Sequence, residues 1–129
     1  MIPRTKTDTI VIHCSATPED MDIGVEKIRH WHVDENKWDD IGYHYVIRRD
    51  GTLETGREEH RTGSHARAVN GTSIGICMIG GSNKKGDWEN NFNDKQFETL
   101  KDIVIKLKDK YNITKVIGHY EVDDVKKCP

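Results

Sequence analysis

The sequence has 129 residues and a formal net charge of −2, and its charged residues, 33% of the total, mix both signs. This length supports a hydrophobic core without disulfide bonds, so we expect residues 1–129 to form a single domain. The nearly balanced charge argues against nucleic-acid binding. No apolar stretch approaches the roughly 20 residues of a transmembrane helix, and the first residues lack the apolar core of a signal peptide.

Five strands and two helices are predicted in chain order. Residues 9–14 are apolar on both faces, as in the central strand of a sheet that is covered on both sides. Residues 24–36 carry apolar side chains at three-four spacing, which predicts a helix. Residues 43–48 and 52–55 flank Asp50-Gly51, a strong signal for a two-residue hairpin.

The second half of the chain predicts the remaining elements. Residues 73–79 form the fourth strand, and Asn93 begins a helix with Gln96 placed as in a capping box. The apolar stripe of that helix comprises Phe97, Leu100, Ile103, Val104, Leu107 and Tyr111. Residues 115–117 form the last strand. This order predicts an α/β fold, with a central mixed β-sheet of about five strands and helices packed on it.

The chain contains three cysteines, Cys14, Cys77 and Cys128. An odd number without an export signal argues against a disulfide framework and favours free thiols or a metal ligand. No C-x-x-C motif occurs, which argues against a redox thiol protein. We expect Cys77, inside an apolar run, to be a small buried core residue.

Candidate metal ligands gather around residues 118–129. Gly118 ends the last strand and places His119 at the strand end, and Cys128 follows a basic loop. Zinc requires three protein ligands in a catalytic site and four in a structural one, so a further ligand is needed. His13, near the end of the first strand, is the best candidate, although a buried structural histidine is the alternative. Two imidazoles and a thiolate suit zinc and leave a fourth position for water.

Two other positions have a functional and a structural interpretation. Tyr43 stands at the start of its strand, where strand propensity alone explains a tyrosine but where a phenol could also reach a site. Ser64-His65-Ala66 lies in the long polar segment 56–71. Loops of that length in small domains are often functional, so this tripeptide could form the wall of a site, and solvated loop polarity is an equal alternative.

Six motifs occur in an order found in one known family. They are Ile12-His13-Cys14-Ser15-Ala16-Thr17, Gly42-Tyr43-His44-Tyr45, Arg49-Asp50-Gly51, Gly63-Ser64-His65-Ala66, Asn70-Gly71-Thr72-Ser73-Ile74-Gly75-Ile76, and Gly118-His119 with Cys128-Pro129. On these residues the chain closely resembles the phage-type zinc N-acetylmuramoyl-L-alanine amidases, which are related to the peptidoglycan recognition proteins. The resemblance covers nearly the whole chain.

This resemblance implies a reaction and a catalytic site. These enzymes hydrolyse the amide bond between N-acetylmuramic acid and the L-alanine of the stem peptide in bacterial peptidoglycan. By resemblance, His13, His119 and Cys128 bind Zn²⁺, which polarises the scissile carbonyl and supplies hydroxide. Tyr43 would hydrogen-bond the attacking water or the departing nitrogen. Lys126 would stabilise the negative oxygen of the tetrahedral intermediate.

The lysine assignment stays open between two residues. The family places its lysine two residues before the cysteine, which selects Lys126 here. This chain has one residue more than the family between His119 and Cys128, so Lys127 is a rival. Family members also continue beyond the equivalent of Pro129.

The same motifs lead us to expect substrate contacts from His44, His65 and Asn70. We expect a monomer that is made in the host cytoplasm without a signal peptide. It would act on the cell wall after release across the membrane, as a phage or prophage endolysin that lyses the host cell.

Two further functional classes are weighed against the enzyme. A binding module would recognise peptidoglycan without cutting it, but non-catalytic relatives typically lack the cysteine, so Cys128 with both histidines favours an enzyme. A structural zinc domain would need a fourth ligand such as His44 or Cys14. Strand alternation points His44 away from Tyr43, and Cys14 away from His13, so neither should face the metal.

Overall fold

The computed structural model describes residue 4 and residues 6–121. Its strands are β1 (Thr9–Cys14), β2 (Tyr45–Ile47), β3 (Leu53–Thr55), β4 (Ser73–Met78) and β5 (Lys115–Gly118), and its α-helices are α1 (Val25–Arg29) and α2 (Asp94–Lys110). The five strands form one sheet in the order β3-β2-β4-β1-β5. Only the β2–β3 pair is antiparallel among these strands. The predicted mixed α/β sheet is confirmed.

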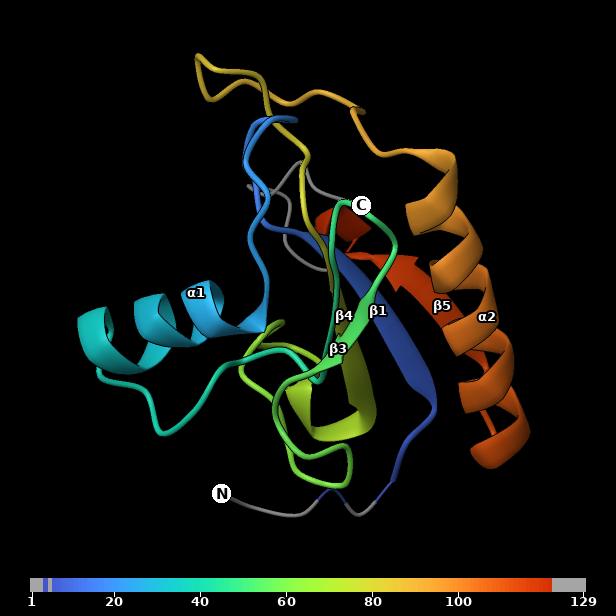
Figure 1. Cartoon of the computed structure of the whole chain (residues 1–129). Coiled ribbons are helices and arrows are strands. Elements are labelled where there is room, and N and C mark those ends of the chain that lie inside the picture. The colour runs from blue at the N-terminus through green and yellow to red at the C-terminus, as the bar shows by residue number, and fades with distance from the viewer. Residues whose placement is uncertain (1–3, 5, 122–129) are drawn as a thin grey trace.

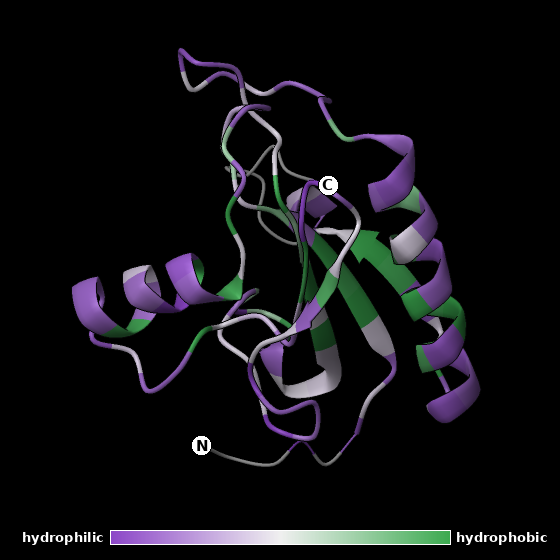
Figure 2. Cartoon of the chain, in the orientation of Figure 1, coloured by the Kyte–Doolittle hydropathy of each residue, from purple (hydrophilic) through white to green (hydrophobic). Residues whose placement is uncertain are grey.

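The sheet carries a hydrophobic core on each face. On one face Ile10, Ile12 and Ile76 pack with Ile103 and Leu107 of α2. On the other face, Val25 and Ile28 of α1 pack with residues that include Ile41, Val46 and Cys77. Figure 1 shows α1 and α2 on opposite sides of the sheet, and Figure 2 shows the apolar strands between them. Every residue of β1 and β4 is buried, as expected for central strands.

The first helix differs from the prediction in its second half. An α-helix ends at Arg29, and a π-helical segment, His30–Glu35, continues it. A π turn carries more residues than an α turn and so rotates the side chains that follow. In this position the Nδ1 atom of His32 accepts a hydrogen bond from the backbone N–H of Gly42 at 2.9 Å. The helix therefore holds the loop that leads into β2.

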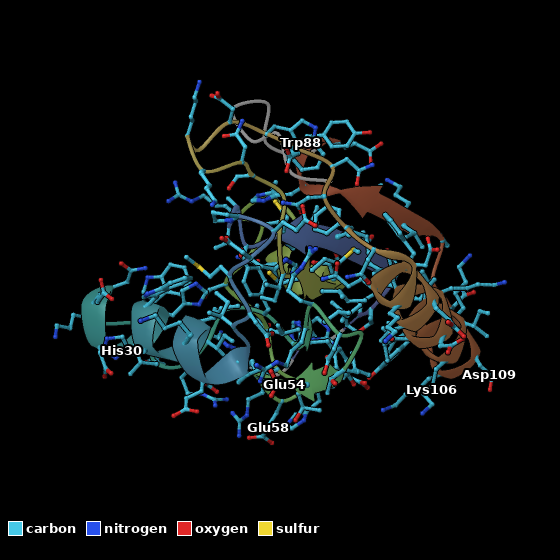
Figure 3. The ribbon with its side chains drawn as sticks, turned by 45° about the horizontal axis from the view of Figure 1, so that its top comes forward. His30, Glu54, Glu58, Trp88, Lys106 and Asp109 are labelled. Atoms are coloured by element: carbon cyan, nitrogen blue, oxygen red, sulfur yellow. The ribbon has the colours of Figure 1, made fainter. Side chains whose placement is uncertain are left out.

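The second helix follows the prediction closely. Asn93 and Gln96 form both hydrogen bonds of the capping box. Leu107 of the predicted apolar stripe is buried against the sheet, whereas Phe97, at the start of that stripe, is 45% exposed. Phe97 lies in the first helical turns, and its ring lies beside Phe92 of the preceding loop, with centroids 6.1 Å apart. Figure 3 shows the charged Lys106 and Asp109 on the outer side of α2.

Strand register determines where the candidate ligands lie. β1 and β5 are parallel neighbours, and Ile12 pairs with Gly118. The next residue is His13 within β1, and it is His119 directly after the end of β5. Parallel strands end at the same edge of a sheet, so these two histidines meet there although they are 106 residues apart in sequence. In the described part of the chain, no helix has the length and apolar character needed to cross a membrane.

Candidate active site

His13 and His119 form the centre of the site. Their Nδ1 atoms lie 3.0 Å apart and their ring centroids 4.3 Å apart. The two residues are 1% and 9% exposed, so this contact is shielded from bulk water. At this distance the facing nitrogens either share one proton or both direct lone pairs at a cation.

Tyr43 stands beside this pair. Its ring centroid lies 5.1 Å from that of His13, with the ring planes inclined at 55°. The loop reaches this position because Gly42 passes close to another segment: a Cβ atom at Gly42 would lie 2.1 Å from the carbonyl oxygen of Ser64. The backbone N–H of Ser64 also donates to the carbonyl of Gly42 at 3.1 Å. The glycine before Tyr43 therefore lets two loops meet next to the histidines.

A pocket of about 520 Å³ lies beside Tyr43, Ser64 and His119. Its lining comprises His32, Trp38, Tyr43, Ser64, His65, Ala66, Arg67, Asn70 and His119. Six residues singled out from the sequence are in this set, namely Tyr43, Ser64, His65, Ala66, Asn70 and His119. His44 does not line the pocket.

His65 lies on the other side of His13 from His119. Its Nδ1 atom lies 2.8 Å from Nε2 of His13, and its Nε2 atom lies 3.3 Å from Oγ of Ser73. Burial, reinforced by the neighbouring histidines, holds the pKa of His65 well below its usual range, so the ring is neutral. His119 faces the Nδ1 atom of His13, whereas His65 faces its Nε2 atom. His65 and His119 therefore do not point at one shared metal position.

Asn70 organises the loop that carries His65. Its Oδ1 atom accepts hydrogen bonds from the backbone N–H groups of His65 and Ala66, both at 2.9 Å. A side-chain oxygen that binds two successive N–H groups fixes the local course of the chain. The Asn70 side chain therefore supports the pocket wall that it also lines.

His44 is enclosed by the protein and is 1% exposed. Its Nδ1 accepts from the backbone N–H of Gly75 at 3.0 Å, so its Nε2 carries the proton and donates to the carbonyl of Arg61 at 2.7 Å. Burial, with added repulsion from Arg4 and Arg57, lowers the pKa of His44 to about 4. With both ring nitrogens bound within the protein, His44, the residue before β2, is joined to β4 and to the 56–71 loop.

His32 and Trp38 are pocket residues that the sequence did not indicate. Nδ1 of His32 is occupied by the Gly42 N–H, so in the neutral ring Nε2 carries the proton. Burial, with repulsion from Arg57, lowers the pKa of His32 and favours this neutral form. The His32 and Trp38 rings lie 4.4 Å apart. The sequence pattern indicated only that His32 lies on a helix. The contact of His32 with Gly42, which places its ring at the pocket, joins segments that no local pattern connects.

The described residues fit two positions of a zinc site. Two imidazole nitrogens converge at the end of β1 and β5, and neutral imidazole is a common zinc ligand. Within residues 4 and 6–121, no cluster of three or more His, Cys, Asp or Glu side chains is arranged to hold a metal. The predicted third ligand, Cys128, and the candidate lysines Lys126 and Lys127 lie outside the described residues.

Cys14 is placed away from this site, as strand alternation predicts. It is buried, and a Cβ atom at Gly81 would come within 2.6 Å of its Sγ atom. Gly81 adopts a φ of +98°, a conformation that glycine accommodates without strain. Cys14 is therefore packed beneath the 80–91 loop, and Cys77 lies in the core as expected.

Comparison with known proteins places the chain in a family. The family model described as N-acetylmuramoyl-L-alanine amidase matches residues 3–129. The endolysin of Klebsiella phage KP32 is 44% identical over 126 residues, which cover 98% of this chain and 82% of that protein.

Solved structures agree with this placement. The endolysin amidase LysCS of Clostridium intestinale superposes with a TM-score of 0.81 at 35% identity, covering 96% of this chain and 75% of that one. The Drosophila protein PGRP-LB superposes with a TM-score of 0.79 at 28% identity, covering 100% of this chain and 81% of that one.

The chain belongs to the N-acetylmuramoyl-L-alanine amidase family. The predicted family, fold and enzyme class are confirmed. The function predicted from the sequence, cleavage of the amide bond between N-acetylmuramic acid and L-alanine in peptidoglycan by a phage-type endolysin, is supported by the same findings.

Proposed function

We propose that this amidase holds one Zn²⁺ ion through His13, His119 and Cys128. The observation that carries the proposal is the 3.0 Å approach of the Nδ1 atoms of His13 and His119, the second of which lines the pocket. A thiolate from Cys128 would complete a three-ligand set typical of catalytic zinc. When bound, zinc would supply Lewis acidity at the scissile carbonyl and lower the pKa of water.

The protein's own groups have distinct proposed roles around this centre. Tyr43 lies beside His13 and lines the pocket, so its phenol can hydrogen-bond the attacking water or the departing amide nitrogen. Lys126, or Lys127 in its place, would offer an ammonium group to the negative oxygen that develops on the carbonyl. The lysine role rests on the sequence resemblance alone.

The pocket lining suggests how a stem peptide is held. Arg67 offers a cation to a peptide carboxylate, and Trp38, which is 39% exposed, offers an apolar face. His32, protonated on Nε2, offers a hydrogen-bond donor to a substrate carbonyl. His65 and Asn70 line the same pocket and remain candidates for substrate contact, whereas the enclosed ring of His44 supports a structural role.

We extend the proposal to the whole chain. Two hydrophobic cores on opposite faces of one sheet support a single catalytic domain over residues 1–129. We propose that it acts as a monomer on bacterial peptidoglycan, without a nucleic-acid partner. We propose further that it reaches the cell wall after release across the membrane of the host.

Digestion of purified peptidoglycan tests this function. The protein as isolated, the protein after chelation and the protein after zinc is restored are incubated with wall material, and mass spectrometry identifies the products. We expect stem peptides with a free L-alanine amine, lost on chelation and regained with zinc. Wall binding without released peptide would instead favour the binding module, and release that survives complete chelation would refute the zinc dependence.

A further inference from the structure

The ring of His13 is engaged from two opposite sides. Its Nδ1 atom faces His119 at 3.0 Å, and its Nε2 atom faces Nδ1 of His65 at 2.8 Å. In a neutral imidazole one nitrogen carries the proton and the other carries a lone pair. The partner on the Nε2 side therefore decides whether Nδ1 can bind a metal.

Ser73 sets the proton position on His65. The Ser73 hydroxyl donates to the carbonyl of Val69 at 2.7 Å, and a carbonyl can only accept. The Ser73 Oγ atom then receives a hydrogen bond from Nε2 of His65, 3.3 Å away. With its proton on Nε2, His65 presents a bare Nδ1 to His13. The Nε2 atom of His13 must then be the donor in the 2.8 Å contact.

We propose that His65 is a positioning residue that, through its bond to Ser73, holds His13 in the tautomer whose Nδ1 can bind a metal. This inference rests on the zinc site proposed above. A metal-binding histidine commonly donates its second N–H to a neighbouring acceptor, and loss of that acceptor typically weakens metal affinity. Here a second imidazole supplies the acceptor.

The protein is built closely around the His65 ring. A Cβ atom at Gly75 would lie 2.5 Å from Cγ of His65, and one at Gly63 would lie 2.6 Å from its Cδ2. The ring therefore fits only because β4 and the 56–71 loop present glycine at these two positions. Asn70 also fixes the backbone of His65, because its Oδ1 atom accepts a hydrogen bond from the His65 N–H. This enclosure limits the ring to one orientation toward His13.

Zinc affinity of matched variants tests the role of His65. His65→Leu removes the acceptor and keeps an apolar side chain in the space, so we expect zinc to bind roughly 10- to 100-fold more weakly in competition with a chelator. His65→Asn places an Oδ1 acceptor near the former Nδ1 position, and most of the affinity should return.

The control is His60→Asn, which changes a histidine whose side chain is 61% exposed and should leave zinc affinity unchanged. Circular dichroism of each zinc-free variant establishes that it is folded. Zinc binding by folded His65→Leu that is as tight as in the unmodified chain would overturn the proposal.

A measurement on the unmodified protein does not depend on variant folding. Long-range ¹H–¹⁵N correlation of the histidine rings reports which nitrogen of each ring carries the proton. We expect protonated Nε2 on both His13 and His65, in the zinc-free as well as the zinc-loaded chain. A proton on Nδ1 of His65 would refute the inference. If the chain binds no zinc, the zinc proposal fails, and the zinc-free spectrum still decides the tautomers.

Discussion

The Nδ1 atoms of His13 and His119 lie 3.0 Å apart although the two residues are separated by 106 positions in the chain. The parallel pairing of β1 with β5, in which Ile12 faces Gly118, brings them together. Two buried imidazole nitrogens that face each other at this distance carry an energetic cost unless a proton or a cation lies between them. This pair is therefore the part of the described structure from which the zinc proposal follows.

Replacement of one of these rings should abolish metal binding. His119→Ala leaves only one of the two proposed imidazole ligands, so we expect zinc content to fall to background after dialysis and peptidoglycan hydrolysis to be lost. Metal analysis and the digestion assay measure both. His30→Ala is the control, because that side chain is 53% exposed and lies outside the pocket. Undiminished zinc content in His119→Ala would contradict the assignment.

Tyr43→Phe separates chemistry from metal binding. The phenylalanine keeps the ring beside His13 but removes the hydroxyl, so we expect turnover to fall by roughly 10²- to 10⁴-fold, the usual contribution of a positioned proton donor or acceptor. Zinc content should stay at one per chain. Full turnover by the phenylalanine variant would exclude a catalytic role for the phenol.

The two candidate lysines can be distinguished directly. Lys126→Ala should lose most turnover while keeping zinc, because its ammonium is proposed to stabilise the oxyanion. Lys127→Ala provides the matched control, since it removes the same charge one residue away. The reverse result, a large loss only with Lys127→Ala, would move the role to Lys127. Equal, undiminished rates would remove both from the mechanism.

Asn70→Ala should destabilise the pocket wall. The change leaves the backbone N–H groups of His65 and Ala66 without their acceptor, at a cost of about 1–3 kcal/mol in the free energy of unfolding. Chemical denaturation measures this loss. Asn70→Asp, which keeps an Oδ1 acceptor, is the comparison and should lose less. An alanine variant as stable as the unmodified chain would show that these hydrogen bonds contribute little.

His44 predicts a pH dependence of stability. Its pKa is lowered to about 4 in the folded protein, compared with about 6.5 in an unfolded chain, so the unfolded state binds more protons between these values. The contribution of neutral His44 to the free energy of unfolding is therefore complete above about pH 6.5 and is lost as the pH falls toward 4. His44→Gln should show a shallower decline of the unfolding midpoint over this range. A His44 ring that titrates near 6.5 by NMR would contradict the account.

Local patterns predicted the elements of the fold well. The run 9–14 is strand β1 as expected, and the Asn93 capping box begins α2. Asp50-Gly51 joins the antiparallel pair β2 and β3, with Gly51 at a φ of +88°. Each of these signals is carried by neighbouring residues, which is why the sequence alone suffices. The π-helical segment at 30–35 was not predicted, because its geometry depends on the contact of His32 with Gly42.

The candidate site was predicted less completely for a related reason. Strand ends and the family resemblance together indicated His13, His119 and Tyr43. The position of His65 behind His13 depends on the close approach of Gly75 to its ring, and the position of His32 depends on a loop contact. Such contacts join segments far apart in sequence and have no local signature. His44, expected to contact substrate, is enclosed because both of its ring nitrogens bind backbone groups.

X-ray absorption at the zinc edge of the zinc-loaded full chain tests the central claim most directly. If His13, His119 and Cys128 hold the metal, the spectrum will show one sulfur ligand at about 2.3 Å and two imidazole nitrogens at about 2.0–2.1 Å. His13→Ala or His119→Ala should remove an imidazole contribution from any metal that remains bound. A spectrum with no sulfur ligand, or with four protein ligands and no open position, would contradict the proposed catalytic site.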